Sequence, residues 1–308
     1  MFLNEVLALT DVAASPSVAT WFAGKSSSEQ QAFAALMTEQ RVGALLYEHL
    51  HASGRHIDLP LPVLAAALDA TRAALSDLGA RRQAVITLLQ ALHDAGLAPL
   101  VVGGAALAHQ LYQPTHSRPF RDITLLISPD ARPRTRVVLD LLTQRGRLAS
   151  LNVTCETHLG AGAVAGLPTY DEAKDHSVAL PALGDSARTI SRPAALLLTL
   201  AKMAAPTPRL IWQHDAWRLL QMMPRNERRT FLQLAGQARL NTIAAAGLKN
   251  IASQFERAER GAAHFLAAEL TARAARLPRE PGADHLAARS AGWRRFLPIK
   301  LAELRARR

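Results

Sequence analysis

The middle of the chain alternates short apolar runs with helical segments, and this alternation most limits the folds open to it. Runs of strand type occur at residues 98–102, 122–128 and 151–159, with a weaker fourth at 176–181. Segments of helical periodicity at 105–112 and 129–146 separate the first three runs. Strand, helix, strand, helix and strand in succession predict a small α/β core.

Helical regions flank this core on both sides. Apolar side chains recur at three- and four-residue spacing over 32–50 and 62–96, where β-branched residues are sparse. After Arg192 the chain returns to the same helical texture. We therefore expect an N-terminal helical region at 1–95, an α/β core at 96–190, a C-terminal helical region at 191–278, and a linker with a basic amphipathic tail at 279–308.

Composition predicts a globular protein of a reducing compartment. The 308 residues are 49% hydrophobic and 20% charged, which is enough apolar material for a substantial core. The single cysteine, Cys155, excludes an intrachain disulfide and a multi-cysteine zinc site. The N-terminus lacks the basic start of a secretory signal, and no apolar segment approaches the ~20 residues of a membrane span. We expect a soluble, cytoplasmic protein.

A formal net charge of +11 favours anionic partners such as nucleic acid, nucleotides or acidic membrane surfaces. The stretch Trp293-Arg294-Arg295-Phe296 and the Arg-rich ending would form a basic, aromatic-interleaved surface for RNA. The same tail equally fits an amphipathic helix docked on the protein's own core, a partner or an anionic membrane. Genome composition also explains the arginine content, because arginine exceeds lysine throughout this alanine-rich chain.

Two glycines, Gly103 and Gly104, stand between the first strand of the core and the helix that follows it. Without side chains the backbone can come close to a polyphosphate, and the unpaired N–H groups at the helix start can donate to its oxygens. A tight strand-to-helix turn would explain the same pair without a ligand. The glycines alone leave both interpretations open.

One carboxylate, Asp122, begins the second strand. Residues two apart on a strand share a face, so Asp122 is paired there with Thr124. Two carboxylates at these positions would bridge two Mg²⁺ ions that neutralise a triphosphate. Because threonine offers only a neutral oxygen, we expect Mg²⁺ or Mn²⁺ to bind weakly here. An Asx-type turn at the strand start is the structural alternative.

The third strand has a polar face that includes Asn152, Thr154, Glu156 and His158. Polar groups on a central strand need partners, and a site would supply them. Glu156 would then be a third carboxylate, acting as metal ligand or as general base toward an acceptor hydroxyl. Solvent exposure of an edge strand is the alternative explanation.

The run LLQALHDAGLAPLVVGGAALAHQLYQPTHSRPFRDITLLIS resembles a large, mostly uncharacterised bacterial nucleotidyltransferase family of the polymerase β superfamily. The resemblance rests on the leading leucines, Gly104 followed by AALA, Leu111-Tyr112, Arg118-Pro119 and the DI-x-LL frame that begins at Asp122. Further similarities, in VGALL, Glu156-Thr157-His158 and RLIWQHDAWRLL, extend it to roughly residues 20–235. The chain departs from the family at Gly103, where lysine is common, and at Thr124, where the second metal-binding aspartate would stand.

This resemblance implies an α+β fold in which a small mixed-sheet, polymerase β-like core is flanked by N- and C-terminal helical regions. It implies transfer of a nucleoside monophosphate from a nucleoside triphosphate (NTP) to a hydroxyl or phosphate of an acceptor. The acceptor would be a small molecule, a peptide or protein, or RNA. The implied site residues are Asp122, Glu156 and Thr124 for catalysis, Asp122 and Glu156 for the metal, and Gly103, Gly104, Arg118 and Arg121 for the nucleotide.

Thr124 motivates a second hypothesis, in which a catalytically weakened or inactive relative keeps the fold as a binding module for a nucleotide, a peptide or a partner enzyme. An RNA-binding protein is the third hypothesis.

His214 and Asp215 lie in a helical segment between two tryptophans. They would be either a catalytic dyad or satisfied polar groups of a helix, of which the latter is commoner.

Overall fold

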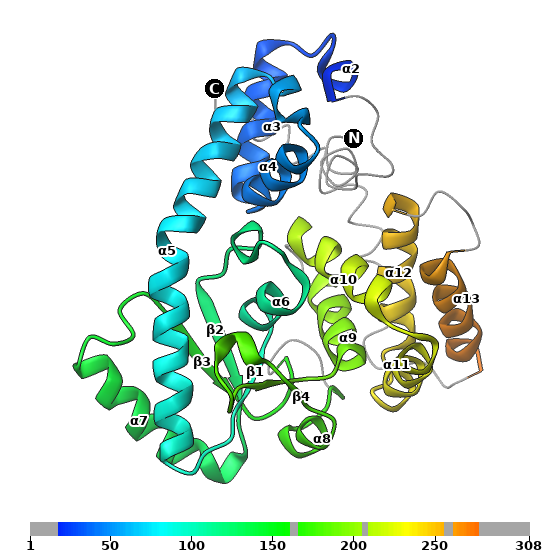
Figure 1. Ribbon diagram of the computed structural model, residues 1–308. Helices are drawn as coiled ribbons and strands as arrows, with labels where there is room; N and C mark the ends of the chain where they lie inside the picture. Colours follow the sequence, from blue (N-terminus) through cyan, green and yellow to red (C-terminus); the bar gives the residue numbers. More distant parts are fainter. Residues whose placement is uncertain (1–17, 161–165, 205–208, 256–260, 277–308) are drawn as a thin grey trace.

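A computed structural model describes residues 18–160, 166–204, 209–255 and 261–276 (Figure 1). Helices surround one five-stranded mixed sheet, which confirms the predicted α+β fold class. The predicted tail at 279–308, including Trp293 to Phe296, lies outside the described residues. Among the helices in the described ranges, none is both long and apolar enough to cross a membrane.

The N-terminal helices end in α5, which runs from them down to the sheet (Figure 1). The elements are α2 (Val18–Phe22), α3 (Ser27–Glu39), α4 (Gly43–Ala52), the 3-10 turn η1 (Arg55–Asp58) and the 34-residue α5 (Leu61–Asp94). A capping box between Ser26 and Glu29 begins α3. A left-handed residue, Arg41 (φ 57°), follows the end of α3, so the helical segment predicted over 32–50 divides into two helices.

The sheet consists of β1 (Leu100–Val102), β2 (Asp122–Leu126), β3 (Asn152–Glu156), β4 (Val178–Ala179) and β5 (Arg188–Thr189), in the order β3-β2-β1-β5-β4. The β1–β2 and β4–β5 pairs are antiparallel, whereas β2–β3 and β1–β5 are parallel. The four apolar runs seen in the sequence each contain a strand. The fifth strand has only two residues, too few to show a periodic pattern.

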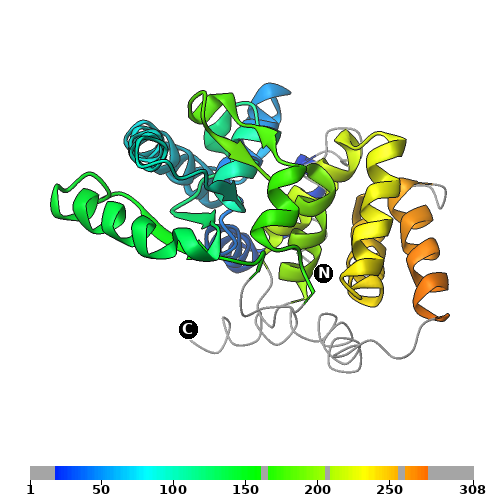
Figure 2. The same ribbon diagram turned by 90° about the horizontal axis from the view of Figure 1, so that it is seen from below.

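The two faces of the sheet enter different cores. Val101 and Ile123 pack in a core with α5, while Val102 and Leu126 join the larger core of the N- and C-terminal helices. Figure 2 shows α5 on one side of the sheet and α9 to α13 on the other. Because side chains alternate along a strand, Thr124 shares the face of Leu126 and looks toward the C-terminal helices.

Short helices connect the strands: α6 (Gly104–Leu111), η2 (Thr115–Ser117), η3 (Pro129–Ala131), α7 (Arg132–Gln144), α8 (Tyr170–Asp175) and η4 (Pro181–Leu183). The helix α6 separates the two cores, since Ala105 and Ala108 pack toward α5 and Leu107 and Leu111 toward the C-terminal helices. The Gly-Gly turn, which precedes α6, therefore lies where the two cores meet.

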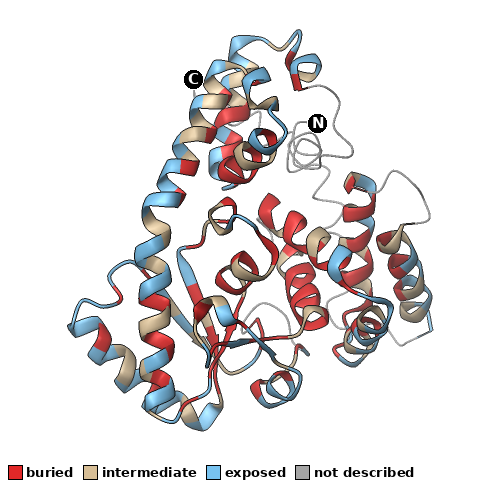
Figure 3. Ribbon diagram, in the orientation of Figure 1, coloured by how far each residue is buried: buried red, intermediate tan, exposed pale blue. Residues whose placement is uncertain are grey.

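The C-terminal region comprises α9 (Arg192–Met203), α10 (Leu210–Met222), α11 (Arg225–Gln237), α12 (Asn241–Phe255) and α13 (Ala262–Ala274). A left-handed residue, Arg239 (φ 54°), lies between α11 and α12. At the centre lies α9, with ten of its 12 residues buried (Figure 3). The two that are not fully buried are Arg192, paired with Glu227, and Lys202.

Two glycines test the packing of α5. A Cβ at Gly43 would lie 2.8 Å from the Cβ of Ala70 on α5, whereas one at Gly79 would meet nothing within 4 Å. We expect Gly79→Ala to raise the free energy of unfolding by about 0.5–1 kcal/mol because it restricts the unfolded chain. Gly43→Ala should lower it by about 1–3 kcal/mol because α4 must move away. Urea denaturation followed by circular dichroism measures both, and equal stability of the two variants would contradict the close α4–α5 contact.

Candidate functional site

The Gly-Gly turn and the start of β2 lie at the same end of the sheet. Val102 pairs with Thr124, so the residues after Val102 reach the end at which β2 begins. Gly103 adopts φ 72° and ψ −141°, a conformation that favours glycine, and α6 begins at the next residue. Backbone N–H groups at the start of α6 are thus available at a turn with no side chain in the way.

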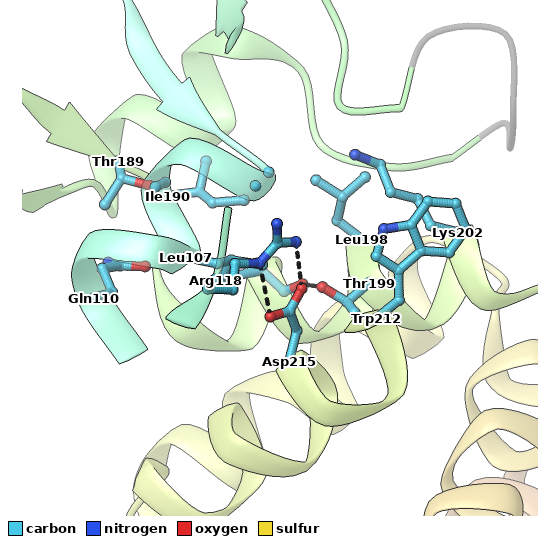
Figure 4. Close-up of a pocket in the computed structure, with 14 residues that line it drawn as sticks. Leu107, Gln110, Arg118, Thr189, Ile190, Leu198, Thr199, Lys202, Trp212 and Asp215 are labelled. Atoms are coloured by element: carbon cyan, nitrogen blue, oxygen red, sulfur yellow. Dashed lines mark hydrogen bonds and ion pairs between the residues drawn. The ribbon is translucent and has the colours of Figure 1, made fainter. Parts of the chain in front are cut away.

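A narrow pocket opens beside this turn, between β5, α6, α9 and α10 (Figure 4). Its lining includes Gly103, Gly104, Arg118, Thr189, Lys202, Trp212 and Asp215. The cavity volume is about 20 Å³, room for about one water molecule. A nucleotide therefore cannot enter whole, and its phosphates would have to lie across the mouth.

A buried ion pair forms the floor of the pocket. Arg118 donates from Nε to Oδ1 of Asp215 at 3.1 Å and from Nη2 to Oδ2 at 2.7 Å (Figure 4). Arg118 is 6% exposed and Asp215 is 0% exposed. Burial alone would lower the pKa of Arg118, but the charge and hydrogen bonds of Asp215 outweigh it and raise that pKa, so the guanidinium stays charged.

Two further side chains complete this buried network. Tyr112 donates its hydroxyl proton to Oδ1 of Asp215 at 2.7 Å, and its oxygen lies 2.9 Å from Nδ1 of His214. Burial lowers the pKa of His214 to about 3, so its ring is neutral near pH 7 and donates from Nδ1 to the tyrosine oxygen. His214 and Asp215 thus have structural partners, which supports the alternative that they are satisfied helix polar groups.

Two cations flank the glycines. A Cβ at Gly104 would lie 3.1 Å from Nη1 of Arg118, the guanidinium nitrogen that is not bonded to Asp215. A Cβ at Gly103 would lie 3.3 Å from Nζ of Lys202. Burial lowers the pKa of Lys202, with the charge of Glu156 acting in the opposite direction. Lys202 was not predicted as a site residue, although a lone lysine in the apolar helix 192–203 was a signal for it.

Asp122 stands alone among the predicted carboxylates at this end of the sheet. It is exposed, and its Oδ1 accepts a 3.1 Å hydrogen bond from Nδ2 of Asn152, its partner in the register. Thr124 pairs with Thr154. The β2–β3 register therefore places neutral side chains where further carboxylates would join Asp122.

Glu156 lies at the other end of β3. It pairs with Leu126, four residues beyond Asp122, which separates the two backbone positions by about 13 Å along the strands. Its Oε2 accepts a hydrogen bond from the backbone N–H of Gly160 at 3.1 Å. The structure does not bring Asp122 and Glu156 together, and the shared metal site inferred from the sequence finds no support in this register.

The residues present do not fit a paired divalent metal site. Such a site needs oxygen ligands with negative charge, and Asp122 has only Asn152, Thr124 and Thr154 beside it on the two strands. Across the described ranges, no group of three or more histidine, cysteine, aspartate or glutamate residues could hold a metal ion. Arg121, the other predicted phosphate ligand, is exposed next to Asp122.

Comparison with known protein families agrees with the fold. Residues 26–146 match the model of a family described as uncharacterised nucleotidyltransferase. This match confirms the resemblance to a nucleotidyltransferase family over α3 to α7, which includes the Gly-Gly turn, Arg118 and Asp122 but not Glu156 or Lys202. Over these residues the protein is nucleotidyltransferase-like. No curated protein and no solved structure matches the chain.

The buried network makes a stability prediction. Asp215→Ala leaves the buried charge of Arg118 without its partner and should lower the free energy of unfolding by about 3–5 kcal/mol. Tyr112→Phe removes only a hydroxyl and should lower it by about 1–2 kcal/mol. The matched control is Asp140→Ala, which breaks the exposed pair with Arg136 and should change stability by less than about 0.5 kcal/mol. Urea denaturation measures these changes. Equal losses of unfolding free energy in Asp215→Ala and Asp140→Ala would contradict a stabilising role for the buried network.

Proposed function

We propose that this protein binds the phosphates of an NTP at the Gly103–Gly104 turn, and that its nucleotidyl transfer is strongly weakened. The observation that carries the binding proposal is the pair of cations at the glycines. Arg118 and Lys202 come from different parts of the chain, yet each directs a nitrogen to one glycine of a helix-start turn. Charge-assisted hydrogen bonds and backbone N–H groups together are the usual means of holding phosphate.

A different observation motivates the weakened transfer. Phosphoryl chemistry depends mainly on neutralising the charge that develops on the phosphate oxygens, and paired carboxylates with two metal ions are one way to do so. Here Asp122 is the one carboxylate at its end of β2 and β3, and Thr124, Asn152 and Thr154 are neutral. Losing metal ligands should reduce the rate by orders of magnitude, since each 1.36 kcal/mol of lost stabilisation is about tenfold.

Other functions have less support. An acceptor site would have to lie beyond the mouth of the pocket, and its chemistry remains a proposal among small molecules, peptides or proteins, and RNA. The RNA-binding alternative rested on the Arg-rich tail, which lies outside the described residues. The residues of the proposed NTP site, in contrast, all lie within the described ranges.

Binding of an NTP tests the proposal directly. We expect at least one of ATP, GTP, CTP and UTP to bind the full chain in calorimetric titration. Lys202→Gln should weaken that binding by about tenfold or more, because it removes one charge-assisted hydrogen bond to phosphate. The control is Lys249→Gln, an exposed lysine on α12, which should bind as the wild type does. If Lys202→Gln bound the NTP with unchanged affinity, Lys202 would not be part of the phosphate site.

Restoring a carboxylate tests the explanation for weak transfer. Thr124→Asp puts two carboxylates on one face of β2, so we expect Mn²⁺ binding in the presence of NTP, measured by electron paramagnetic resonance, and a gain in nucleotidyl transfer to added acceptors. Thr124→Asn is the neutral control of the same shape and should show neither gain. Equal metal binding by the wild type and Thr124→Asp would show that Thr124 does not limit the site.

A further inference from the structure

Positive charge extends from the two cations of the Gly-Gly pocket to three further arginines, Arg41, Arg121 and Arg209. Arg41 lies within electrostatic range of Arg118, Arg121 and Arg209, and Lys202 lies within range of Arg118 and Arg209. Three carboxylates act on this group: Asp122 on Arg41, Asp215 on Arg118, and Glu156 on Lys202. Five cationic side chains against three carboxylates leave an excess of two positive charges, the charge that one Mg²⁺ ion would bring.

A hydrogen bond fixes two of these arginines together. The backbone N–H of Leu210, at the start of α10, donates to Oε1 of Gln40 at the end of α3 at 3.1 Å. Arg41 and Arg209 are the chain neighbours of these two residues, so the bond brings them side by side despite their separation in sequence. The guanidinium of Arg209 also lies 5.8 Å from the ring centroid of Trp212, which lines the pocket.

Repulsion from neighbouring arginines acts on Arg41. The side chains of Arg41 and Arg121 are exposed, and neither makes an ion pair within the described part of the chain. The pKa of Arg41 is lowered, first by partial burial and next by the charges of Arg209 and Arg121. Like charges held this close destabilise one another until an anion lies between them.

Polar atoms inside the pocket also lack partners. Thr189 on β5 is 1% exposed and lines the pocket, yet its hydroxyl has no hydrogen-bond partner among the described residues. Gln110 on α6 contributes a second buried oxygen, Oε1, without a partner in the same ranges. Buried polar groups of this kind normally find a partner, and a water held between the phosphate and the pocket wall would supply one.

We propose that Arg41, Arg121 and Arg209 bind the triphosphate directly in place of a divalent cation, so that this protein binds metal-free NTP. The inference rests on the proposed NTP site at the Gly-Gly turn and adds to it the source of charge neutralisation. Guanidinium groups suit this role because they remain charged and present several donors in a planar fork that matches phosphate oxygens. Arg118 and Lys202 hold the phosphates at the glycines, and the three arginines neutralise them from the outer side.

The chain offers a matched pair of variants for the test. Arg41 and Arg239 are the two non-glycine residues with positive φ in the described ranges, and each follows the end of a helix, α3 and α11 respectively. Glycine is favoured at such positions, so both Arg41→Gly and Arg239→Gly should fold with undiminished stability while each removes one exposed arginine. Arg239 is not among the charges that act on Arg41, Arg118 or Lys202.

The experiment is calorimetric titration of ATP, GTP, CTP and UTP into the full chain, once with EDTA and once with excess Mg²⁺. We expect the wild type to bind in EDTA with an affinity within about threefold of that in Mg²⁺. Arg41→Gly should bind about tenfold or more weakly in EDTA and recover part of the loss in Mg²⁺, because the metal then supplies the missing charge. Arg239→Gly should match the wild type under both conditions.

The outcomes separate the two proposals. Wild-type binding that appears only with Mg²⁺ would overturn metal-free binding while leaving the NTP site in place. Equal affinities of Arg41→Gly and Arg239→Gly in EDTA would overturn the role of the arginines in the same way. No binding of any NTP under either condition would overturn the proposed NTP site, and this inference with it.

Discussion

The buried pair of Arg118 and Asp215 is the interaction on which the rest of the site depends. A guanidinium this deep is stable only with a carboxylate beside it, and Asp215 comes from a helix 97 residues further along the chain. The pair therefore joins α10 to the segment that leads into β2. Tyr112 donates a further hydrogen bond to Oδ1 of Asp215, and His214 contacts the tyrosine oxygen. Because the same guanidinium faces Gly104, the geometry of the proposed phosphate site follows from a contact that stabilises the fold.

Sequence patterns predicted the local features well. The apolar runs identified the longer strands, and the Gly-Gly pair identified a helix-start turn, because both depend on residues close together in the chain. The position of Glu156 could not be predicted in this way, since alternation shows which face a residue takes but not the register of its strand. Lys202 and the Arg41–Arg209 pair depend on contacts across more than 90 residues, which no local pattern encodes.

Charge at the site is organised differently from the carboxylate-rich arrangement that the resemblance implies. Thr124 stands where the resemblance implies an aspartate, and Asn152 and Thr154 beside it on β3 are neutral. The cations around Gly103 and Gly104 outnumber the carboxylates that act on them. These two features belong together physically. Five cationic side chains beside three carboxylates keep an excess of positive charge, and the field of that excess attracts anions.

The hydrogen bond between Gln40 and Leu210 joins the N-terminal helices to the C-terminal helices, which also share the larger core. Arg41 belongs to the N-terminal helices, Arg121 to the sheet, and Arg209 to the C-terminal helices, so one small surface draws a charge from each of the three regions. An anion held there acts as a non-covalent cross-link between them. Binding of the anion would therefore stabilise the three regions together. The regions that unfold as one unit define how far from the site that stabilisation extends.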